Sequence, residues 1–195
     1  ESLFRMAQRA PSWCNVQPWK LDLLSGAARD ELSRSLLAAD AAGVKGGDFS
    51  APDEYPGVYR VRRRATAQQL YDSLGISLQD MAARQRQARA NLRFFGAPHV
   101  GIITTDRRLG VYGVLDCGAY ISTLLLAAES LGLAAVPQAA VAMYAGAVRR
   151  TLALPSDRLV VAAVSLGYAD GTHPANAFRT SRASVADTVT SVESL

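Results

Sequence analysis

The sequence predicts a single α+β domain in which a central mixed or antiparallel sheet is flanked by helices. Three observations lead to this fold class. Helical and strand-like apolar segments follow one another without a strict β-α-β period. The chain has 195 residues, which is enough for one domain, residues 1–195, with a sizeable core. Its hydrophobic content of 49% and charged content of 19% are those of an ordinary globular protein.

The spacing of apolar residues assigns the elements in chain order. Apolar positions that repeat every three to four residues predict helices, and alternating or β-branched runs predict strands. The expected helices cover residues 2–9, 27–39, 64–95, 112–131, 144–154 and 183–192. Within 64–95 the helix is expected to break at Gly75 and to start again at Ser77. The expected strands cover residues 19–24, 99–104 and 158–166, and loops are expected at 43–57 and 169–182.

Residues 112–131 form the most apolar segment, which is hydrophobic around most of its circumference. A helix of this kind is buried on all sides, at the centre of a domain or in a dimer interface. A second helix could approach closely along its small residues, Gly113, Gly118, Ala119 and Ser122. Asp116 lies in the same segment and must be hydrogen-bonded, because an isolated buried carboxylate is costly. A bond to a nearby backbone amide is favoured over catalysis.

Residues 10–19, APSWCNVQPW, form the most distinctive stretch of the chain. Its two prolines fix the backbone and remove two backbone donors, so we expect a rigid loop. Ser12, Asn15 and Gln17 could point the same way in an extended loop. They could then bind a planar polar ligand that the tryptophans shield from water, or they could cap the loop's own backbone. Trp19 opens a strand and is expected in the core.

The common catalytic constellations are missing from the sequence. It has only two histidines, and no nucleophile elbow, HExxH, CxxC, P-loop or glycine-rich dinucleotide motif. Its two cysteines have no metal-ligand spacing, so we expect no metal site, no disulfide framework and a reducing cytoplasm. An enzyme with so few acid and base groups most plausibly takes its chemistry from a cofactor.

Charge and hydropathy bear on two further classes of partner. The net charge is +4, and arginines cluster within residues 60–64 and 84–93. Because aromatic residues are not interleaved with these arginines, we expect a solvated helical face rather than a nucleic-acid surface. No run reaches about 18 uninterrupted apolar residues, so we expect no membrane span. No secretory signal is visible either.

Several motifs resemble the FMN-dependent nitroreductase family. APSWCNVQPW resembles the Pro-Ser-x-x-Asn-x-Gln-Pro-Trp run that lines the flavin site near the N-terminus of these enzymes. Five further runs resemble family segments in the expected order: NLRFFGAPHV (91–100), LDCGAYISTLLLAAESLGL (115–133), VPQAA (136–140), VVAAVSLGY (160–168) and NAFRTSRASVADTV (176–189). The resemblance covers nearly the whole chain.

The resemblance implies FMN as the cofactor and a set of binding residues. The implied flavin contacts are Pro11, Ser12, Trp13, Asn15 and Gln17 in the loop, and Pro137, Gln138 and Ala139 beside the ring, with backbone amides near Gln138 and Ala139 as donors. The family's Arg-Ser-x-Arg phosphate motif, upstream of the loop, is absent from the sequence given. The remaining phosphate candidates are Arg179 and Arg182, since an arginine fork matches phosphate oxygens. The long helix would form a homodimer, and the tail 169–195 would reach the partner.

The implied activity is an oxidoreductase that takes electrons from NAD(P)H and passes them to a nitroaromatic or quinone acceptor. One cleft would serve both substrates, which implies ping-pong kinetics. The flavin carries the chemistry, so no side chain is expected to be catalytic. Two alternatives stay open: a flavin-binding protein without turnover, and a different reductive or dehydrogenase activity on the same scaffold.

Overall fold

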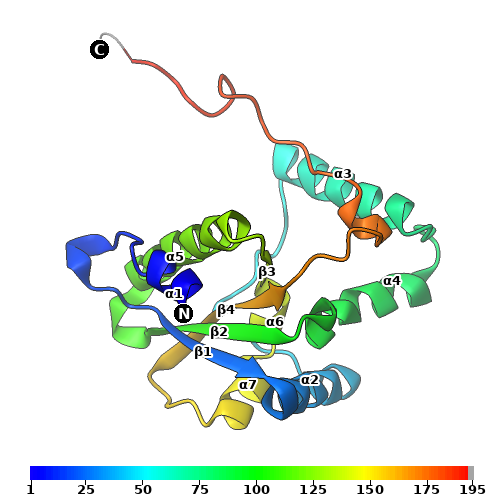
Figure 1. Ribbon diagram of the computed structural model, residues 1–195. Helices are drawn as coiled ribbons and strands as arrows, with labels where there is room; N and C mark the ends of the chain where they lie inside the picture. The colour runs from blue at the N-terminus through cyan, green and yellow to red at the C-terminus, as the bar shows by residue number, and fades with distance from the viewer. Residues whose placement is uncertain (193–195) are drawn as a thin grey trace. The chain divides into compact units, whose positions relative to one another are not determined.

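The computed structural model describes residues 1–192 (Figure 1). The last three residues of the expected tail 169–195 lie outside the described part. The chain divides into two compact units. Glu1–Asp53 and Gln85–Ala169 form the first unit, and Glu54–Arg84 with the tail from Asp170 forms the second. The organisation as one domain stays a prediction.

A four-stranded sheet forms the centre of the first unit. Its strands are β1 (Lys20–Ser25), β2 (His99–Asp106), β3 (Ala134–Gln138) and β4 (Arg158–Gly167), in the spatial order β1-β2-β4-β3. All three pairings are antiparallel, which confirms the α+β class and selects the antiparallel form of the expected sheet. The three strands expected from the sequence are present, and each extends one or two residues beyond the predicted end.

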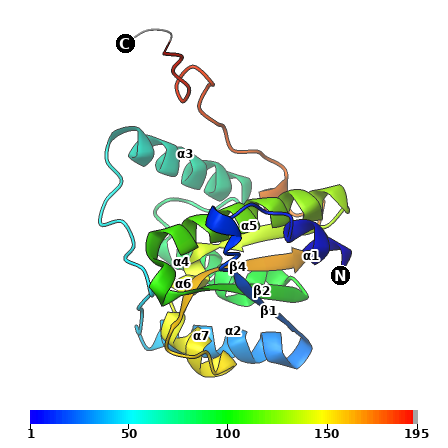
Figure 2. The same cartoon turned by 90° about the vertical axis from the view of Figure 1, so that its left-hand side faces the viewer.

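Two helices cover one face of the sheet, α1 (Ser2–Ala7) and α5 (Gly110–Ser130). Figure 2 shows α5 on the opposite side of the sheet from α2 and α7. The core on the α5 face joins Leu3 of α1 with Cys117 and Leu124 of α5 and with Ile103 and Val164 of the sheet. Burial of these apolar side chains holds the long helix against the strands.

The other face carries α2 (Gly26–Ala41), α6 (Ala139–Ala142) and α7 (Ala145–Leu152). Leu32 and Leu36 of α2 and Val148 of α7 pack there against Ile102 and Val160. Neighbouring strand residues point to opposite faces, which is why Ile102 belongs to this core and the residue after it to the other. A 3₁₀ segment, η2 (Ala90–Gly96), replaces the end of the helix expected over 64–95.

Helix α5 is buried on one side only, so the expectation of burial all round is wrong for this chain by itself. Along its outer side runs a row of apolar and small residues, here called the outer row: Val111, Leu115, Gly118, Ser122 and Leu126. Val111, Leu115 and Leu126 are 75%, 65% and 73% exposed. Gly113 belongs instead to the inner side, where an added Cβ would lie 2.7 Å from Thr105 Oγ1. The expected stripe of small residues is therefore split between the two sides.

The helical stretch Arg107–Ser130 is long and apolar enough to cross a membrane by length and composition alone. Core helices of soluble proteins meet the same two criteria. In this protein the inner side of the stretch packs against the sheet. We therefore treat α5 as a core helix with one exposed apolar side.

The second unit contains α3 (Gly57–Ser73), the first part of α4 (Met81–Arg89) and a 3₁₀ turn, η4 (Pro174–Asn176). The arginine-rich helix α3 has no buried residue, and all its residues are described. Arg63 lies 5.1 Å above the ring of Tyr55, and Arg84 lies 5.4 Å above that of Tyr71. The composition predicted a solvated helical face of this kind.

Two expected helix features in the second unit are wrong. Helix α4 begins at Met81 rather than near Ser77, because Asp80 is its N-cap and accepts a hydrogen bond from the Ala83 amide at 2.9 Å. Residues 183–192 form a turn rather than a helix. The Ser184 hydroxyl bonds the carboxylate of Asp187, and this local bond closes a single turn. A short segment with exposed apolar residues gains no packing that would extend it.

Candidate functional site

The loop between α1 and β1 has an unusual backbone. It contains a 3₁₀ turn, η1 (Trp13–Asn15), and three non-glycine residues with positive φ: Cys14 at 50°, Asn15 at 56° and Gln17 at 50°. Each such residue costs on the order of 1 kcal/mol unless its surroundings hold it. Strain of this kind gathers at ligand-binding sites, so the loop is a candidate for function.

The polar side chains of the loop lie together, as the sequence predicted. The Ser12 hydroxyl accepts a hydrogen bond from the backbone amide of Gln17 at 2.9 Å. The Gln17 side-chain amide donates to the side-chain and backbone oxygens of Asn15, both at 3.1 Å. The capping interpretation is therefore confirmed for Ser12 and Gln17, and ligand binding by the loop stays a prediction. The side chains cap the loop's own backbone, and the exposed Asn15 and Gln17 can still bind a ligand.

Asp116 ties the start of the loop to α5. This residue is buried, and its two carboxylate oxygens lie 3.2 and 3.3 Å from the Trp13 backbone nitrogen, which donates to them. The expectation that Asp116 bonds a backbone amide is confirmed. The amide lies 103 positions away in the sequence, inside the predicted flavin loop.

Aromatic contacts hold both tryptophans of the loop against the same helix. The Trp13 ring meets the ring of Tyr112 edge to face, with centroids 4.2 Å apart. Trp19 is buried and stacks on Tyr120 at 5.0 Å, and its indole nitrogen donates to Gln8 Oε1 at 2.7 Å. The expectation that Trp19 belongs to the core is confirmed. The loop is thus fixed to α5 near both of its ends.

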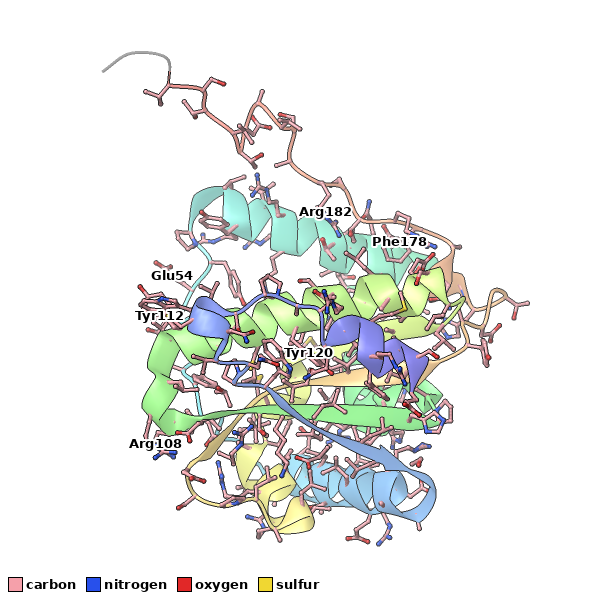
Figure 3. All side chains as sticks on the ribbon, turned by 60° about the vertical axis from the view of Figure 1, so that its left-hand side comes forward. Glu54, Arg108, Tyr112, Tyr120, Phe178 and Arg182 are labelled. Atoms are coloured by element: carbon pink, nitrogen blue, oxygen red, sulfur yellow. The ribbon has the colours of Figure 1, made fainter. Side chains whose placement is uncertain are left out.

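One row of residues at four-residue spacing on α5 receives the loop, and we call it the loop-facing row: Tyr112, Asp116 and Tyr120. Residues four apart lie on one side of a helix. Figure 3 shows Arg108 and Tyr112 at the end of α5 where the chain enters from β2, and Tyr120 further along the helix. Tyr112 and Tyr120 were not predicted from the sequence as neighbours of the loop. Their regular spacing around Asp116 was the available signal.

A cavity of about 240 Å³ lies between the loop and the first turns of α5. Its lining is Trp13, Cys14, Val16, Arg108, Leu109, Tyr112, Gly113 and Asp116. The Arg108 guanidinium pairs with the Asp106 carboxylate at 2.6 Å and holds the pKa of that carboxyl well below its usual range. The cavity combines aromatic walls with a few polar groups, which is typical of sites for small planar ligands.

The second group of predicted flavin contacts lies where β3 ends and α6 begins. Gln138 is only 2% exposed, and its side-chain nitrogen donates to the Asn91 carbonyl at 2.8 Å. Its side-chain oxygen accepts from the Ser165 hydroxyl. Pro137 and Ala139 are exposed. The Gln138 side chain therefore serves the fold, and the backbone remains as the part of this corner that can bind a ligand. That role of the amides stays a prediction.

The two arginines predicted to bind a phosphate belong to the second unit and are exposed. Arg179 donates from Nη1 to the carbonyls of Asn176 and Phe178, both at 2.9 Å. Arg182 donates from Nη1 to Thr180 and Ser181. Within residues 1–192, the hydrogen bonds of both guanidinium groups use Nη1 alone. Their role in phosphate binding stays a prediction.

The two cysteines do not form a reactive site with each other. Cys14 is exposed in the loop, as a small loop residue would be, whereas Cys117 is buried in α5. Burial raises the pKa of the Cys117 thiol to about 11. A thiol with that pKa stays protonated at neutral pH and is a poor nucleophile. Cys117 is therefore not a nucleophile at neutral pH, and the expectation that no side chain is catalytic stays a prediction.

Comparison with known proteins identifies the family. A model of the nitroreductase family matches residues 1–168. The chain is 36% identical over 188 residues to nitroreductase NfnB of Mycolicibacterium smegmatis, covering 96% of this chain and 80% of that protein. It is 39% identical over 185 residues to 4-nitrobenzoate reductase of Nocardioides sp., covering 92% and 75%.

A solved structure agrees with this result. The crystal structure of the FMN-dependent nitroreductase NfnB from Mycobacterium smegmatis in complex with NADPH superposes with a TM-score of 0.93 at 35% identity. The match covers 98% of this chain and 86% of the solved one. The order of motifs along the chain, the antiparallel sheet and these similarities agree, and the chain belongs to the nitroreductase family.

Proposed function

We propose that this protein is an FMN-dependent oxidoreductase that takes electrons from NADPH and reduces nitroaromatic compounds. Two of the similar solved structures are described as FMN- and NADPH-dependent nitroreductases. Similar proteins are named 4-nitrobenzoate reductase and nitrobenzene nitroreductase. The observation that carries the proposal is the strained loop, which keeps Asn15 and Gln17 exposed while Asp116 holds its backbone.

The donors and acceptors of the loop fit the polar edge of a flavin ring. Hydroxyl and amide side chains both donate and accept hydrogen bonds, as the nitrogens and oxygens of that edge require. Ser12, Asn15 and Gln17 provide one hydroxyl and two amides within a single hydrogen-bonded cluster. Their lack of charge suits a neutral heteroaromatic ring.

Bound FMN supplies the hydride chemistry that connects NADPH oxidation with reduction of a nitro group. In this proposal the loop side chains orient the ring edge, and Asp116 keeps the loop in place. Trp13 and Tyr112 exclude water from the side of the cavity that they line. The backbone amides near Gln138 and Ala139 would donate hydrogen bonds to the bound ring. A fixed donor at that position stabilises negative charge as it develops.

The active form in this proposal is a homodimer in the cytoplasm. The outer row of α5 exposes Val111, Leu115 and Leu126, with Gly118 and Ser122 between the last two. Large exposed apolar residues in one row mark an interaction surface. Small residues among them allow a second helix to come close. The tail from residue 169 would then reach the partner subunit. The mass of the protein in solution, measured by light scattering, tests this part directly.

The test of the function begins with the colour of the purified protein. We expect flavin absorbance near one FMN per chain and rapid bleaching on mixing with NADPH in a stopped-flow instrument. Reoxidation should follow with 4-nitrobenzoate, nitrobenzene or a quinone as acceptor. A protein that neither carries nor binds added FMN would contradict the proposal. Binding of FMN without NADPH oxidation by any acceptor would instead identify a flavin-binding protein without turnover.

A further inference from the structure

Asp116 lies where the rigid core of the protein meets the loop. It belongs to α5, whose inner side packs against the sheet, and its partner is the backbone of Trp13. We infer that Asp116 is a positioning residue for FMN, which sets the conformation in which Ser12, Asn15 and Gln17 present their polar groups. This inference rests on the proposed function, since it assigns the loop to the flavin.

The backbone of the loop explains why an external anchor is needed. The internal hydrogen bonds of the loop connect Ser12, Asn15 and Gln17 to one another, so they define its shape but do not attach it to the core. Cys14 and Asn15 are in the left-handed region, which costs free energy that other contacts must offset. The bond from Trp13 to Asp116 immediately precedes these two residues. Its loss would release the strained part of the loop.

The Trp13 amide is shared between both carboxylate oxygens at 3.2 and 3.3 Å, so the importance of the bond comes from the burial of Asp116 rather than from its length. Asp116 is 8% exposed, so its carboxylate has little access to water. A buried carboxylate needs hydrogen-bond donors, and removing one partner of such a bond costs more than the same change at the surface. Tyr112 and Tyr120, one helical turn before and after Asp116, contact Trp13 and Trp19. The carboxylate therefore lies in the middle of the contact between α5 and the loop.

Three variants separate positioning from general stabilisation. Asp116→Ala removes the acceptor for the Trp13 amide, and Asp116→Asn keeps one acceptor oxygen at nearly the same volume. Asp48→Ala is the matched control, because Asp48 also accepts from a backbone amide, that of Val160 at 2.7 Å, and pairs with Arg149 at 2.8 Å. The side chain of Asp48 is 15% exposed, and it lies outside the loop contact.

The experiment measures three quantities on each purified variant. They are the dissociation constant for FMN from flavin fluorescence, the thermal midpoint without FMN, and the exchange rate of the amide hydrogens of residues 11–17. We expect Asp116→Ala to weaken FMN binding about tenfold and to speed exchange at Trp13 by a similar factor. Asp116→Asn should retain most of the FMN affinity and most of the protection of the Trp13 amide from exchange. Asp48→Ala should lower the thermal midpoint at least as much and leave FMN affinity and loop exchange unchanged.

The outcomes distinguish this inference from the proposed function. If Asp116→Ala left FMN affinity unchanged, or if Asp48→Ala weakened it equally, Asp116 would be a structural residue and the inference would be wrong. If the unaltered protein bound no FMN, the proposed function would fail, and with it the flavin part of the inference. In that case the exchange rates would still show whether Asp116 holds the loop.

Discussion

The two faces of the sheet use their polar side chains in different ways. On the α2 face, Gln138 is buried and its side chain bonds Asn91 and Ser165. On the α5 face, Asn15 and Gln17 remain exposed while a buried carboxylate binds the backbone of their loop. The sequence placed Gln17 and Gln138 in the same set of flavin contacts. The difference shows that a polar side chain can serve a ligand only where the fold leaves its donors and acceptors accessible.

The largest effect expected from this comparison is on folding. Gln138→Leu keeps the volume but leaves the Asn91 carbonyl and the Ser165 hydroxyl without their partner. Each buried group left unsatisfied costs roughly 1–3 kcal/mol, so the free energy of unfolding should fall by about 3 kcal/mol. Urea denaturation measures it. The control is Gln17→Asn, which should change that free energy by less than about 0.5 kcal/mol. Equal destabilisation by both variants would remove the distinction between the faces.

A second effect on the α2 face depends on pH. Asp40 accepts hydrogen bonds from the Tyr144 hydroxyl at 2.7 Å and from Arg89 at 2.6 Å, and these bonds hold the pKa of its carboxyl below the usual range. A pKa that is lower in the folded state stabilises the protein above the unfolded pKa, near 4, and this stabilisation is lost as the pH falls through the folded value.

Asp40→Asn should therefore lower the free energy of unfolding by about 2 kcal/mol at pH 7. The difference in free energy of unfolding between the variant and the unaltered protein should become smaller below about pH 4, where the unaltered Asp40 also loses its charge. Denaturation curves at pH 7, 4 and 3 measure this gap. Asp30→Asn is the control, since Asp30 pairs with Arg29 at the surface and should matter by less than about 0.5 kcal/mol. A gap that did not change with pH would show that the charge is irrelevant.

The third effect is on ligand binding at the α5 face. Asn15→Gly removes the side-chain amide and keeps a residue that adopts positive φ without strain. We expect FMN affinity to fall about tenfold while the free energy of unfolding stays within about 0.5 kcal/mol of its original value. Fluorescence titration and urea denaturation measure the two quantities. Asn15→Ala is the companion variant, which adds backbone strain at φ 56°. If only the alanine variant lost affinity, the conformation of Asn15 and not its amide would be what FMN requires.

Local patterns were sufficient for most of the fold. Strands β1, β2 and β4 were predicted from alternating or apolar β-branched runs, whereas the edge strand β3 was not predicted. The loop between Pro11 and Pro18 was predicted from its prolines and the family motif. Long-range contacts were not predictable in the same way. The burial of Asp116 required a hydrogen-bond donor, but nothing near Asp116 in the sequence identified the Trp13 amide as that donor. The amide and the carboxylate are 103 residues apart, and they meet only because α5 packs beside the loop.

Hydropathy also did not distinguish the buried side of α5 from its exposed side. Leu115 and Leu124 look alike in the sequence, yet Leu124 packs in the core and Leu115 is exposed on the outer row. A leucine in the core and a leucine exposed on the surface have the same hydropathy, so the sequence could not separate them. Gln138 shows the same limit for polar residues, since its motif did not reveal which of its atoms the fold already uses.

The smallest expected effect tests the aromatic contact that supports the loop. Tyr112→Leu removes the edge-to-face contact with Trp13 but leaves the Asp116 bond in place. Such a contact contributes about 0.5–1.5 kcal/mol, so FMN affinity should fall about threefold. The control is Tyr112→Phe, which keeps the ring and should bind FMN as tightly as the unaltered protein. A loss as large as that of Asp116→Ala would instead make the aromatic contact the main anchor of the loop, and the carboxylate would be secondary.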